Sequence, residues 1–412
     1  MPRDSSPPET APGVKRSGPS LPARILLSRE ASVFFVLVLL CVLMAFSPAR
    51  GQFFSPRNLQ QILLQVGLLS IFAIGETIVI ITGGIDLSLG SLIAFSGMLL
   101  ALTVNALNEH TSLFPTGAVV LGMLITLLVC TGLGAWHSAL IHRVRLPAFV
   151  VTLVSLLVLR SQSLIMNSHQ QIPMDAKKFP LFDWLANGKI PEQAPLGMPV
   201  PVILLAVIAV VVHIILTRTR MGRYLYSVGS NEQATELSGV SVATVKLFAY
   251  GVSALLGGVA GLLYMGYGGQ GDPTAGQSYE LYAVAAAVVG GASLTGGQGS
   301  VPGTVLGACL LNTIRSVILL TLAQPDLWND TVVGGVLMLA VLTTVFQGRD
   351  SRAFANRRNI WIFALLPAAW LFYRLIRIPF PGLELHPTSA FLLVILVLLA
   401  VVYLLPQREK AS

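Results

Sequence analysis

The sequence consists largely of long apolar runs joined by short connections. A helix needs about 20 apolar residues to cross the hydrocarbon core of a bilayer. Runs close to this length cover residues 31–46, 60–82, 86–105, 115–138, 147–166, 199–216, 247–266, 301–323, 328–346, 360–377 and 389–405, and an interrupted apolar region covers 279–297. We therefore predict an all-α polytopic membrane protein. It has about ten core transmembrane helices, broken at Gly-rich motifs, and two extra C-terminal helices.

The composition excludes most classes of soluble protein. Charged residues make up only 11% of the chain and hydrophobic residues 54%, whereas roughly 25% of the residues in a soluble domain are charged. A soluble enzyme, a disordered protein or a nucleic-acid-binding protein would not have this balance. The net charge of +8 is explained by membrane topology and contact with anionic lipid, so no nucleic-acid partner is expected.

The chain divides into three parts. Residues 1–24 are rich in Pro, Ser and charge and are predicted to form a disordered cytoplasmic tail. Residues 25–347 are predicted to form the main transmembrane domain, and residues 348–412 an extension with two predicted transmembrane helices. With the N-terminus inside, the cytoplasmic stretches contain 17 of the 26 Lys and Arg residues. The positive-inside rule therefore favours a multi-pass protein of the inner membrane, N-in and C-in.

Several kinds of chemistry have no support in the sequence. The Gly-rich stretch TGGQGSVPG lacks the lysine of a phosphate-binding loop. The three cysteines and six histidines show no metal-ligand spacing. We therefore expect no catalytic residues, no metal site and no cofactor bound by this chain.

The first Gly-rich region, ETIVIITGGIDLSLGS, contains two carboxylates within or beside apolar runs. Asp86 begins one run and is interpreted as the N-cap of the following helix, assisted by Ser88. The alternative is a polar gate at a helix break. Glu76 lies inside the preceding run, where a carboxylate must face a partner, a cavity or the bundle interior.

A second region echoes the first. The residues from Gly290 to Leu294 resemble those from Gly83 to Leu87, and each group is followed by Gly-Ser and an apolar run. Paired Gly-interrupted segments are typical of internal duplication around a central pathway. The many Gly and Ala residues nearby are also explained by close helix packing.

The inside connection, residues 217–246, carries a short helix signal over 232–238. The N-cap is either Ser230 or Asn231, and Gly239 is a natural C′ residue. This helix either lies on the bundle surface or docks into a cytoplasmic partner. The residues assigned to partner coupling are Ser230, Asn231, Glu232, Ala234, Ser238 and Gly239.

Three segments in the same order resemble a known family. They are GETIVIITGGIDLSLGS, GRYLYSVGSNEQATELSGVSVATVK and DPTAGQSYELYAVAAAVVGGASLTGGQGSVPGTVLGA, the last with Pro273, Gly276, Tyr279, Glu280 and Leu281 in place. Together they resemble the permease subunits of bacterial ABC importers for monosaccharides of the ribose, xylose and arabinose type. The resemblance extends over about residues 30–347.

The resemblance implies a sugar permease that works with other proteins. A cytoplasmic ATPase subunit would hold ATP and Mg and grip the helix near Asn231. A periplasmic sugar-binding protein would deliver substrate at the outside surface, which includes residues 167–198, and a second permease copy or a paralogue would complete the pathway. The candidate pathway residues are the polar side chains Glu76, Asp86, Ser88, Gln270, Glu280 and Asn312.

Three other functions remain open at this point. The same architecture could move another small polar solute, such as an autoinducer sugar or an amino acid. An ion-coupled secondary transporter would need more intramembrane carboxylates than Glu76 and Asp86. A membrane enzyme would need a cluster of His, Asp or Cys at catalytic spacing.

Overall fold

The computed structural model describes residues 29–110, 114–175, 177–192, 194, 197–321, 330–331 and 333–338. The predicted tail 1–24 and the predicted spans 360–377 and 389–405 lie outside these residues, and the span 328–346 is described only in part. The domain boundary at residue 348 therefore stays a prediction.

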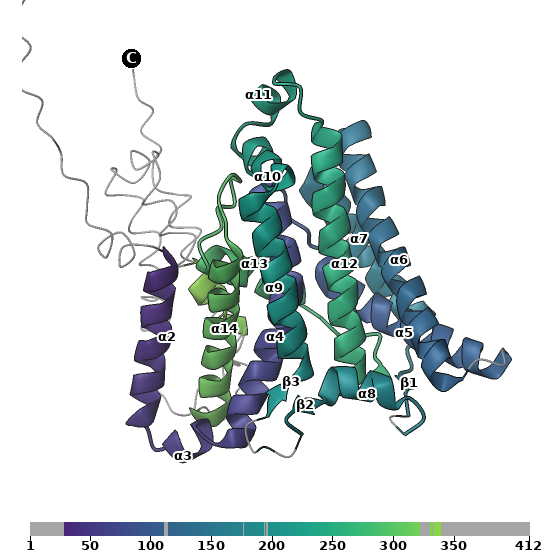
Figure 1. Ribbon diagram of the computed structural model, residues 1–412, viewed down its shortest axis with the longest axis vertical. Helices are drawn as coiled ribbons and strands as arrows, with labels where there is room; N and C mark the ends of the chain where they lie inside the picture. Colours follow the sequence, from purple (N-terminus) through teal and green to yellow (C-terminus); the bar gives the residue numbers. More distant parts are fainter. Residues whose placement is uncertain are drawn as a thin grey trace, which may run out of the picture. The chain divides into compact units, whose positions relative to one another are not determined.

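The described chain is almost entirely helical, as predicted (Figure 1). Its helices are α2 (Arg29–Ala45), α3 (Arg50–Phe53), α4 (Pro56–Ile81), α5 (Leu89–His110), α6 (Pro115–Arg143), α7 (Ala148–Ile165), α8 (Pro180–Asn187), α9 (Val200–Arg218), α10 (Arg220–Ser230), α11 (Glu232–Leu237), α12 (Val242–Gly268), α13 (Tyr279–Val289) and α14 (Val301–Thr321). Four two-residue strands form two antiparallel pairs. β1 (Ile172–Pro173) pairs with β4 (Gln270–Gly271), and β2 (Lys189–Ile190) pairs with β3 (Met198–Pro199).

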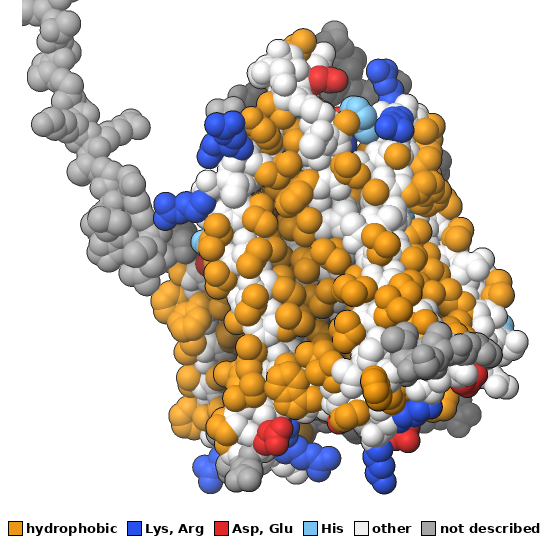
Figure 2. Space-filling view, turned by 45° about the vertical axis from the view of Figure 1, so that its right-hand side comes forward, with side chains coloured by type: hydrophobic (Ala, Val, Ile, Leu, Met, Phe, Trp, Pro, Cys, Tyr) orange, Lys and Arg blue, Asp and Glu red, His pale blue; other side chains and the backbone are white. Residues whose placement is uncertain are grey.

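Seven of these helices are long and apolar enough to cross a membrane, namely α4, α5, α6, α7, α9, α12 and α14. The shorter apolar helices α2 and α13 accompany them. Figure 2 shows apolar side chains across the middle of the visible face, with Lys, Arg, Asp and Glu gathered toward its two ends. A bilayer requires this distribution, because hydrocarbon cannot solvate charge. The protein is therefore a multi-pass membrane protein.

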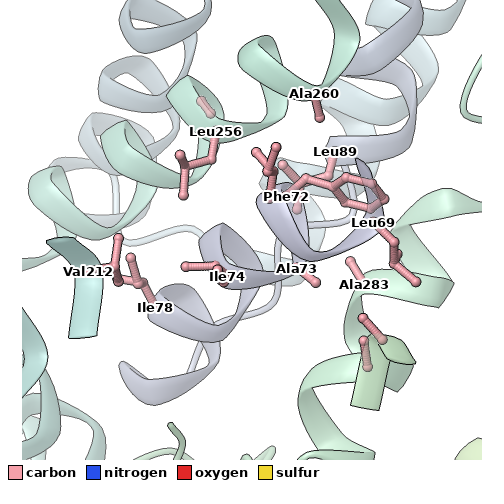
Figure 3. Packing of buried hydrophobic residues seen from close by; sticks show 14 of the residues in the cluster. Leu69, Phe72, Ala73, Ile74, Ile78, Leu89, Val212, Leu256, Ala260 and Ala283 are labelled. Carbon is pink, nitrogen blue, oxygen red and sulfur yellow. The ribbon is translucent and has the colours of Figure 1, made fainter. Parts of the chain in front are cut away.

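Helix α4 lies at the centre of the bundle. It begins where the Ser55 hydroxyl accepts a hydrogen bond from the Asn58 N–H and Pro56 occupies the first turn. In an apolar stretch of 18 residues of α4, 89% is buried, whereas the corresponding share is 28% in both α7 and α9. Figure 3 shows its apolar side chains packed toward α12, α5, α13 and α9. Helices α7 and α9 consequently leave most of their surface outside the packed core of the bundle.

The two ends of the bundle differ (Figure 1). Helices α10 and α11 lie at one end, which we call the α11 end, whereas α3, α8 and the strands lie at the other, the α8 end. The connection 167–198 forms the α8 end together with the residues that follow α12, because β1 pairs with β4. The connection 217–246 forms the α11 end. The two long connections therefore lie on opposite sides, as the apolar pattern predicts.

The two Gly-rich motifs end their helices in the same way. Helix α4 stops at Ile81 and α13 at Val289, and a residue with positive φ follows each, Gly83 at φ 81° and Gly291 at φ 100°. The predicted break in 279–297 is therefore present. The two motifs also meet, because a Cβ added to Gly296 would lie 3.0 Å from the Gly83 Cα. The internal duplication itself stays a prediction.

Candidate functional site

Two buried carboxylates lie at the centre of the bundle. The side chains of Glu76, on α4, and Asp86, in the α4–α5 loop, are both fully buried. The Asp86 N–H donates to both oxygens of Glu76, at 3.1 and 3.3 Å. Asp86 in turn accepts from the Ser88 N–H at 3.1 Å, the Ser88 hydroxyl at 2.6 Å and the Ser253 hydroxyl of α12 at 3.1 Å. We call these four residues the central polar cluster.

The interpretation of Asp86 as the N-cap of the next helix is wrong. Helix α5 begins at Leu89, three residues after Asp86. The Asp86 carboxylate folds back onto Ser88 and closes a turn inside the loop, which satisfies the N–H and hydroxyl of Ser88 before the helix starts. Its other oxygen reaches α12, so Asp86 joins the loop to a neighbouring helix.

The central polar cluster should tolerate an amide at Asp86 but not an alkyl group. Asp86→Ala removes the acceptor of three hydrogen bonds in a buried site. The expected cost is about 3 kcal/mol or more of unfolding free energy. Asp86→Asn keeps an oxygen for Ser88 and can donate to the Ser253 hydroxyl, so most of the stability should remain. Thermal unfolding of the purified variants in detergent measures the difference, and equal midpoints would contradict it.

Neighbouring helices hold the same loop in place. The Thr152 hydroxyl of α7 donates to the Ile85 carbonyl at 3.1 Å. Beside it, Nε2 of buried His137 on α6 lies 2.7 Å from the Ser155 hydroxyl of α7. Polar groups from three helices, α4, α7 and α12, therefore converge on residues 82–88, which makes this loop a junction of the bundle.

A cavity of about 320 Å³ opens toward the α8 end. Its walls come from α4, α5, α12, β4, the β4–α13 loop, α13 and α14, and three tyrosines line it, so we call it the tyrosine cavity. The lining residues are Gln65, Ile93, Gly97, Gly261, Tyr264, Met265, Tyr267, Gly268, Gln270, Asp272, Ala275, Tyr279 and Arg315. Its polar groups are uncharged except for one carboxylate and one guanidinium.

The tyrosine rings are held by their neighbours. Tyr279 stacks on Phe72 with ring centroids 6.2 Å apart and planes within 3°, and its centroid lies 5.2 Å from that of Tyr264. The Tyr267 hydroxyl accepts a hydrogen bond from Gln61 Nε2 at 2.8 Å. The cavity is therefore largely pre-formed, as ligand sites commonly are.

Arg160 on α7 anchors the loop that forms one wall of the cavity. One guanidinium nitrogen donates to the Pro273 carbonyl at 3.1 Å and the Ala275 carbonyl at 2.7 Å, and the other donates to the Gly90 carbonyl at 3.3 Å. The acidic groups that influence Arg160 are Glu280 and Asp272. These carbonyl and acidic groups account for the position of the Arg160 side chain. We therefore assign Arg160 the role of holding residues 272–278 against α5.

A second cavity, of about 720 Å³, lies at the α11 end. It is lined mainly by the ends of α4, α6, α11 and α12: Thr82, Gly83, Gly84, Ile141, His142, Arg143, Arg145, Leu146, Pro147, Ala148, Glu232, Glu236, Lys246 and Tyr250. Along α12, the helix turns between Tyr250 and Gly261 contribute only buried or half-buried residues. About 16 Å of packed helix thus separates the two cavities, and the central polar cluster lies within this packed layer.

Helix α11 is capped at both ends. The Asn231 side-chain oxygen accepts from the Ala234 N–H at 2.9 Å, so Asn231 is the N-cap. Ser230 instead ends α10, and its hydroxyl donates to the Tyr226 carbonyl. Gly239 follows with φ 84°, as predicted for a C′ residue, and Lys246 of α12 pairs with Glu232 at 2.7 Å. The short helix is therefore formed as predicted. Of the two predicted N-cap candidates, Asn231 is the N-cap and Ser230 is not.

Helix α10 connects α11 to the bundle interior. The Tyr226 hydroxyl donates to the Gly299 carbonyl at 2.8 Å, and burial raises the pKa of Tyr226. The Gly297 N–H donates to the Ile81 carbonyl at the end of α4, at 2.9 Å. Gly229 lies against the same carbonyl so closely that no Cβ could be accommodated. A displacement of α11 would thus reach α4 through backbone contacts.

The predicted pathway residues occupy different places. Gln270 lines the tyrosine cavity, whereas Glu76, Asp86 and Ser88 belong to the central polar cluster. Glu280 lies against Gly90, beside Arg160. Asn312 is buried on α14 and donates to the Ala308 carbonyl of its own helix. The structure thus brings three of the six together in the central polar cluster and places Gln270 in the wall of the tyrosine cavity.

The cavity residues that the sequence analysis did not single out are Gln65, Tyr264, Tyr267, Asp272 and Arg315. Gln65 and Arg315 are polar residues within apolar runs, a signal that marks functional positions in membrane helices. The tyrosines carry no such signal, since tyrosine is common at membrane interfaces. Among the described residues, no group of three His, Cys, Asp or Glu side chains could hold a metal ion.

The chain is thus a bundle of membrane-crossing helices with a cavity toward each end and a capped helix projecting at one end, an architecture that suits a membrane transport protein. The sequence matches the family of branched-chain amino acid transport system permease components over residues 58–342. The chain belongs to this family, which makes it a multi-pass permease of the inner membrane. Permeases of this kind are transport proteins and not normally enzymes, and they act with ATPase and substrate-binding subunits.

Characterised relatives cover most of the chain. It is 35% identical to the ribose import permease protein RbsC of Escherichia coli (strain K12) over 321 residues, 77% of this chain and 93% of that protein. It is 30% identical to the xylose transport system permease protein XylH of Haemophilus influenzae, covering 77% and 96%. It is also 30% identical to the L-arabinose ABC transporter permease protein AraH of Azospirillum brasilense, covering 80% and 91%. No solved structure matches the chain.

Proposed function

We propose that this chain is the membrane-spanning permease subunit of an ATP-driven importer for a monosaccharide, a pentose or a hexose. The observation that carries the proposal is its similarity, over nearly the full length of each relative, to permeases named for ribose, xylose and arabinose. The tyrosine cavity supports it, because a small cavity lined with hydroxyl and amide groups suits a small uncharged polyol.

The partners follow from the two ends of the bundle. A cytoplasmic ABC ATPase, which holds ATP and Mg, engages the projecting helix α11. The permease chain itself binds no cofactor. A periplasmic sugar-binding protein docks at the α8 end, formed partly by residues 167–198. A second copy of the permease, or a paralogue, completes the assembly in the lipid bilayer. This arrangement requires the N-in and C-in orientation that the distribution of Lys and Arg favours.

Uptake in cells lacking their own pentose importers tests the proposal. The chain would be expressed with its ATPase and binding-protein partners, and labelled D-ribose, D-xylose, L-arabinose and L-leucine would be supplied separately. We expect uptake of a sugar, abolished when the ATPase loses its phosphate-binding lysine. Uptake of leucine alone would favour the amino-acid alternative that the family description raises. Sugar uptake without the ATPase would instead identify an ion-coupled transporter.

The cytoplasmic coupling assigned to α11 has its own test. Gly239→Val places a β-branched residue at φ 84°, at a cost of about 1–2 kcal/mol. An added Cβ would meet no heavy atom within 4 Å, so the cost is confined to the backbone. Glu232→Lys additionally reverses a charge that pairs with Lys246. The double variant should accumulate normally in the membrane but lose both ATPase co-purification and uptake.

The matched control at this position is Gly239→Asn. Asparagine adopts positive φ more readily than other residues with a side chain, so this variant should retain ATPase association and uptake. Normal co-purification and uptake in the Gly239→Val, Glu232→Lys double variant would show that α11 is not the coupling element.

A further inference from the structure

The tyrosine cavity combines small size, aromatic walls and balanced charge. We propose that it is a binding site for one monosaccharide ring during import, in which Tyr279, Tyr267 and Gln65 contact the sugar. This inference rests on the proposed function and adds the site and its contact residues. None of these three residues is among the pathway candidates that the sequence analysis selects.

The volume fits a single ring. At about 320 Å³ the cavity is at the lower end of the range for small-molecule sites. It corresponds to roughly ten water molecules at their share of liquid volume, comparable to the non-hydrogen atoms of one pentose or hexose. A disaccharide would extend beyond this volume.

The walls match the two kinds of surface that a sugar ring presents. Tyrosine combines an apolar ring face with a polar hydroxyl, whereas a sugar combines C–H groups with hydroxyls around its edge. Tyr279 is fixed by Phe72 and Tyr264, and Tyr267 by Gln61. Because these groups are ordered before the sugar arrives, binding costs little side-chain entropy.

The charged groups in the cavity favour an uncharged ligand. Asp272 is occupied by the Thr274 N–H at 2.8 Å, the Thr274 hydroxyl at 2.7 Å and Gln171 at 3.2 Å. Arg315 lies close to the phenol groups of Tyr264, Tyr279 and Tyr282. Since one negative and one positive group line the same small space, the cavity has no net charge to attract an ion.

The position of the cavity suits sugar delivered from outside. Its wall at Gln270 and Asp272 is tied to the outer connection by the β1–β4 pair and by Gln171. The packed layer around the central polar cluster closes it toward the α11 end. A sugar released at the α8 end would therefore be retained here until that layer opens.

A steric variant tests whether the cavity must be empty for transport. Gly97 lines it, and an added Cβ would make only ordinary contact, with the nearest atom, Met265 Cβ, 3.4 Å away. Gly97→Leu should fill the space without disrupting the helix contact. The matched control is Gly132→Leu on α6, at an exposed position where an added Cβ meets nothing within 4 Å.

The assay is sugar transport per ATP hydrolysed, in proteoliposomes containing the permease, its ATPase and its binding protein. Each of D-ribose, D-xylose and L-arabinose is supplied alone. If the tyrosine cavity cannot bind sugar, the sugar escapes outward while the binding protein still stimulates ATP hydrolysis. We expect a drop of at least tenfold in sugar per ATP for Gly97→Leu and no change for Gly132→Leu.

Polar variants test the contact residues. Tyr279→Phe removes one hydroxyl, and Gln65→Leu removes one amide. Each should lower sugar per ATP roughly 2- to 10-fold, as expected for one lost neutral hydrogen bond. Gln162→Leu, at an exposed position of α7, is the control for Gln65→Leu and should behave like the wild type.

The outcomes separate the site from the function. Unchanged sugar per ATP in Gly97→Leu, Tyr279→Phe and Gln65→Leu would overturn the site while leaving the proposed function standing. An equal fall in ATP hydrolysis and transport would also overturn it, because that pattern indicates a structural defect. Failure of the wild-type assembly to transport these three pentoses, or a hexose supplied in the same assay, would overturn the proposed function itself.

Discussion

Gly134→Val is expected to prevent α6 from packing against α12 and to abolish accumulation of the folded protein. A Cβ at Gly134 would overlap the Tyr250 carbonyl and lie 2.8 Å from the Ala254 Cβ. Both neighbours belong to α12, so the clash is with a helix backbone and not with a movable side chain. Small residues allow membrane helices to approach this closely, and overpacking such a contact costs about 3 kcal/mol or more.

The same helix supplies the control. Gly132 lies two residues earlier, is exposed, and has no heavy atom within 4 Å of an added Cβ. Gly132→Val carries the same intrinsic change in helix propensity without the clash. Size-exclusion profiles and unfolding temperatures in detergent should therefore separate the two variants. Similar profiles for both would show that the α6–α12 approach does not limit stability.

Gly134 also illustrates what the sequence could predict. The spans were located because apolar runs of membrane-crossing length admit few alternatives to a helix. The short helix α11 was located because Asn231 and Gly239 are strong local signals at its two ends. The contact partner of Gly134 could not be predicted in this way, because nothing in the sequence pairs Gly134 with Tyr250, which is far along the chain.

The site was predictable only in part, for the same reason. Glu76 and Asp86 stand out as carboxylates in apolar surroundings, but the role of Asp86 was assigned to the nearest helix start. The structure shows a tertiary hydrogen bond to Ser253, which no local pattern announces. The tyrosine cavity needs α4, α5 and α14 to meet the stretch from α12 to α13, so its outline is a property of the packing.

Arg160 was overlooked although its signal was present. A guanidinium inside the apolar run 147–166 is costly in a membrane and marks a functional position by default. From the sequence alone, Arg160 enters only the count of basic residues that predicts the topology. Its partners are backbone carbonyls of two other segments. Because every residue has a backbone carbonyl, the sequence does not indicate which of them accept these hydrogen bonds.

Arg160→Met is expected to release the 272–278 loop from α5 and to reduce sugar uptake more than tenfold. The change removes the donor to three carbonyls and the cation near Glu280 and Asp272. Arg160 is only half-buried, so the expected loss of unfolding free energy is about 2–4 kcal/mol. Uptake should fall even in the fraction of protein that stays folded, because Asp272 and Ala275 of this loop line the tyrosine cavity.

Two further variants separate charge from geometry at Arg160. Arg160→Lys keeps the positive charge but cannot reach three carbonyls with a planar fork of donors, so uptake should be intermediate. Arg57→Met removes an exposed arginine at the start of α4 and should leave uptake unchanged. Uptake and unfolding temperature are measured on the same preparations. Full uptake by Arg160→Met would mean that the carbonyl contacts do not hold the loop, since removing the guanidinium leaves the other groups around residues 272–278 in place.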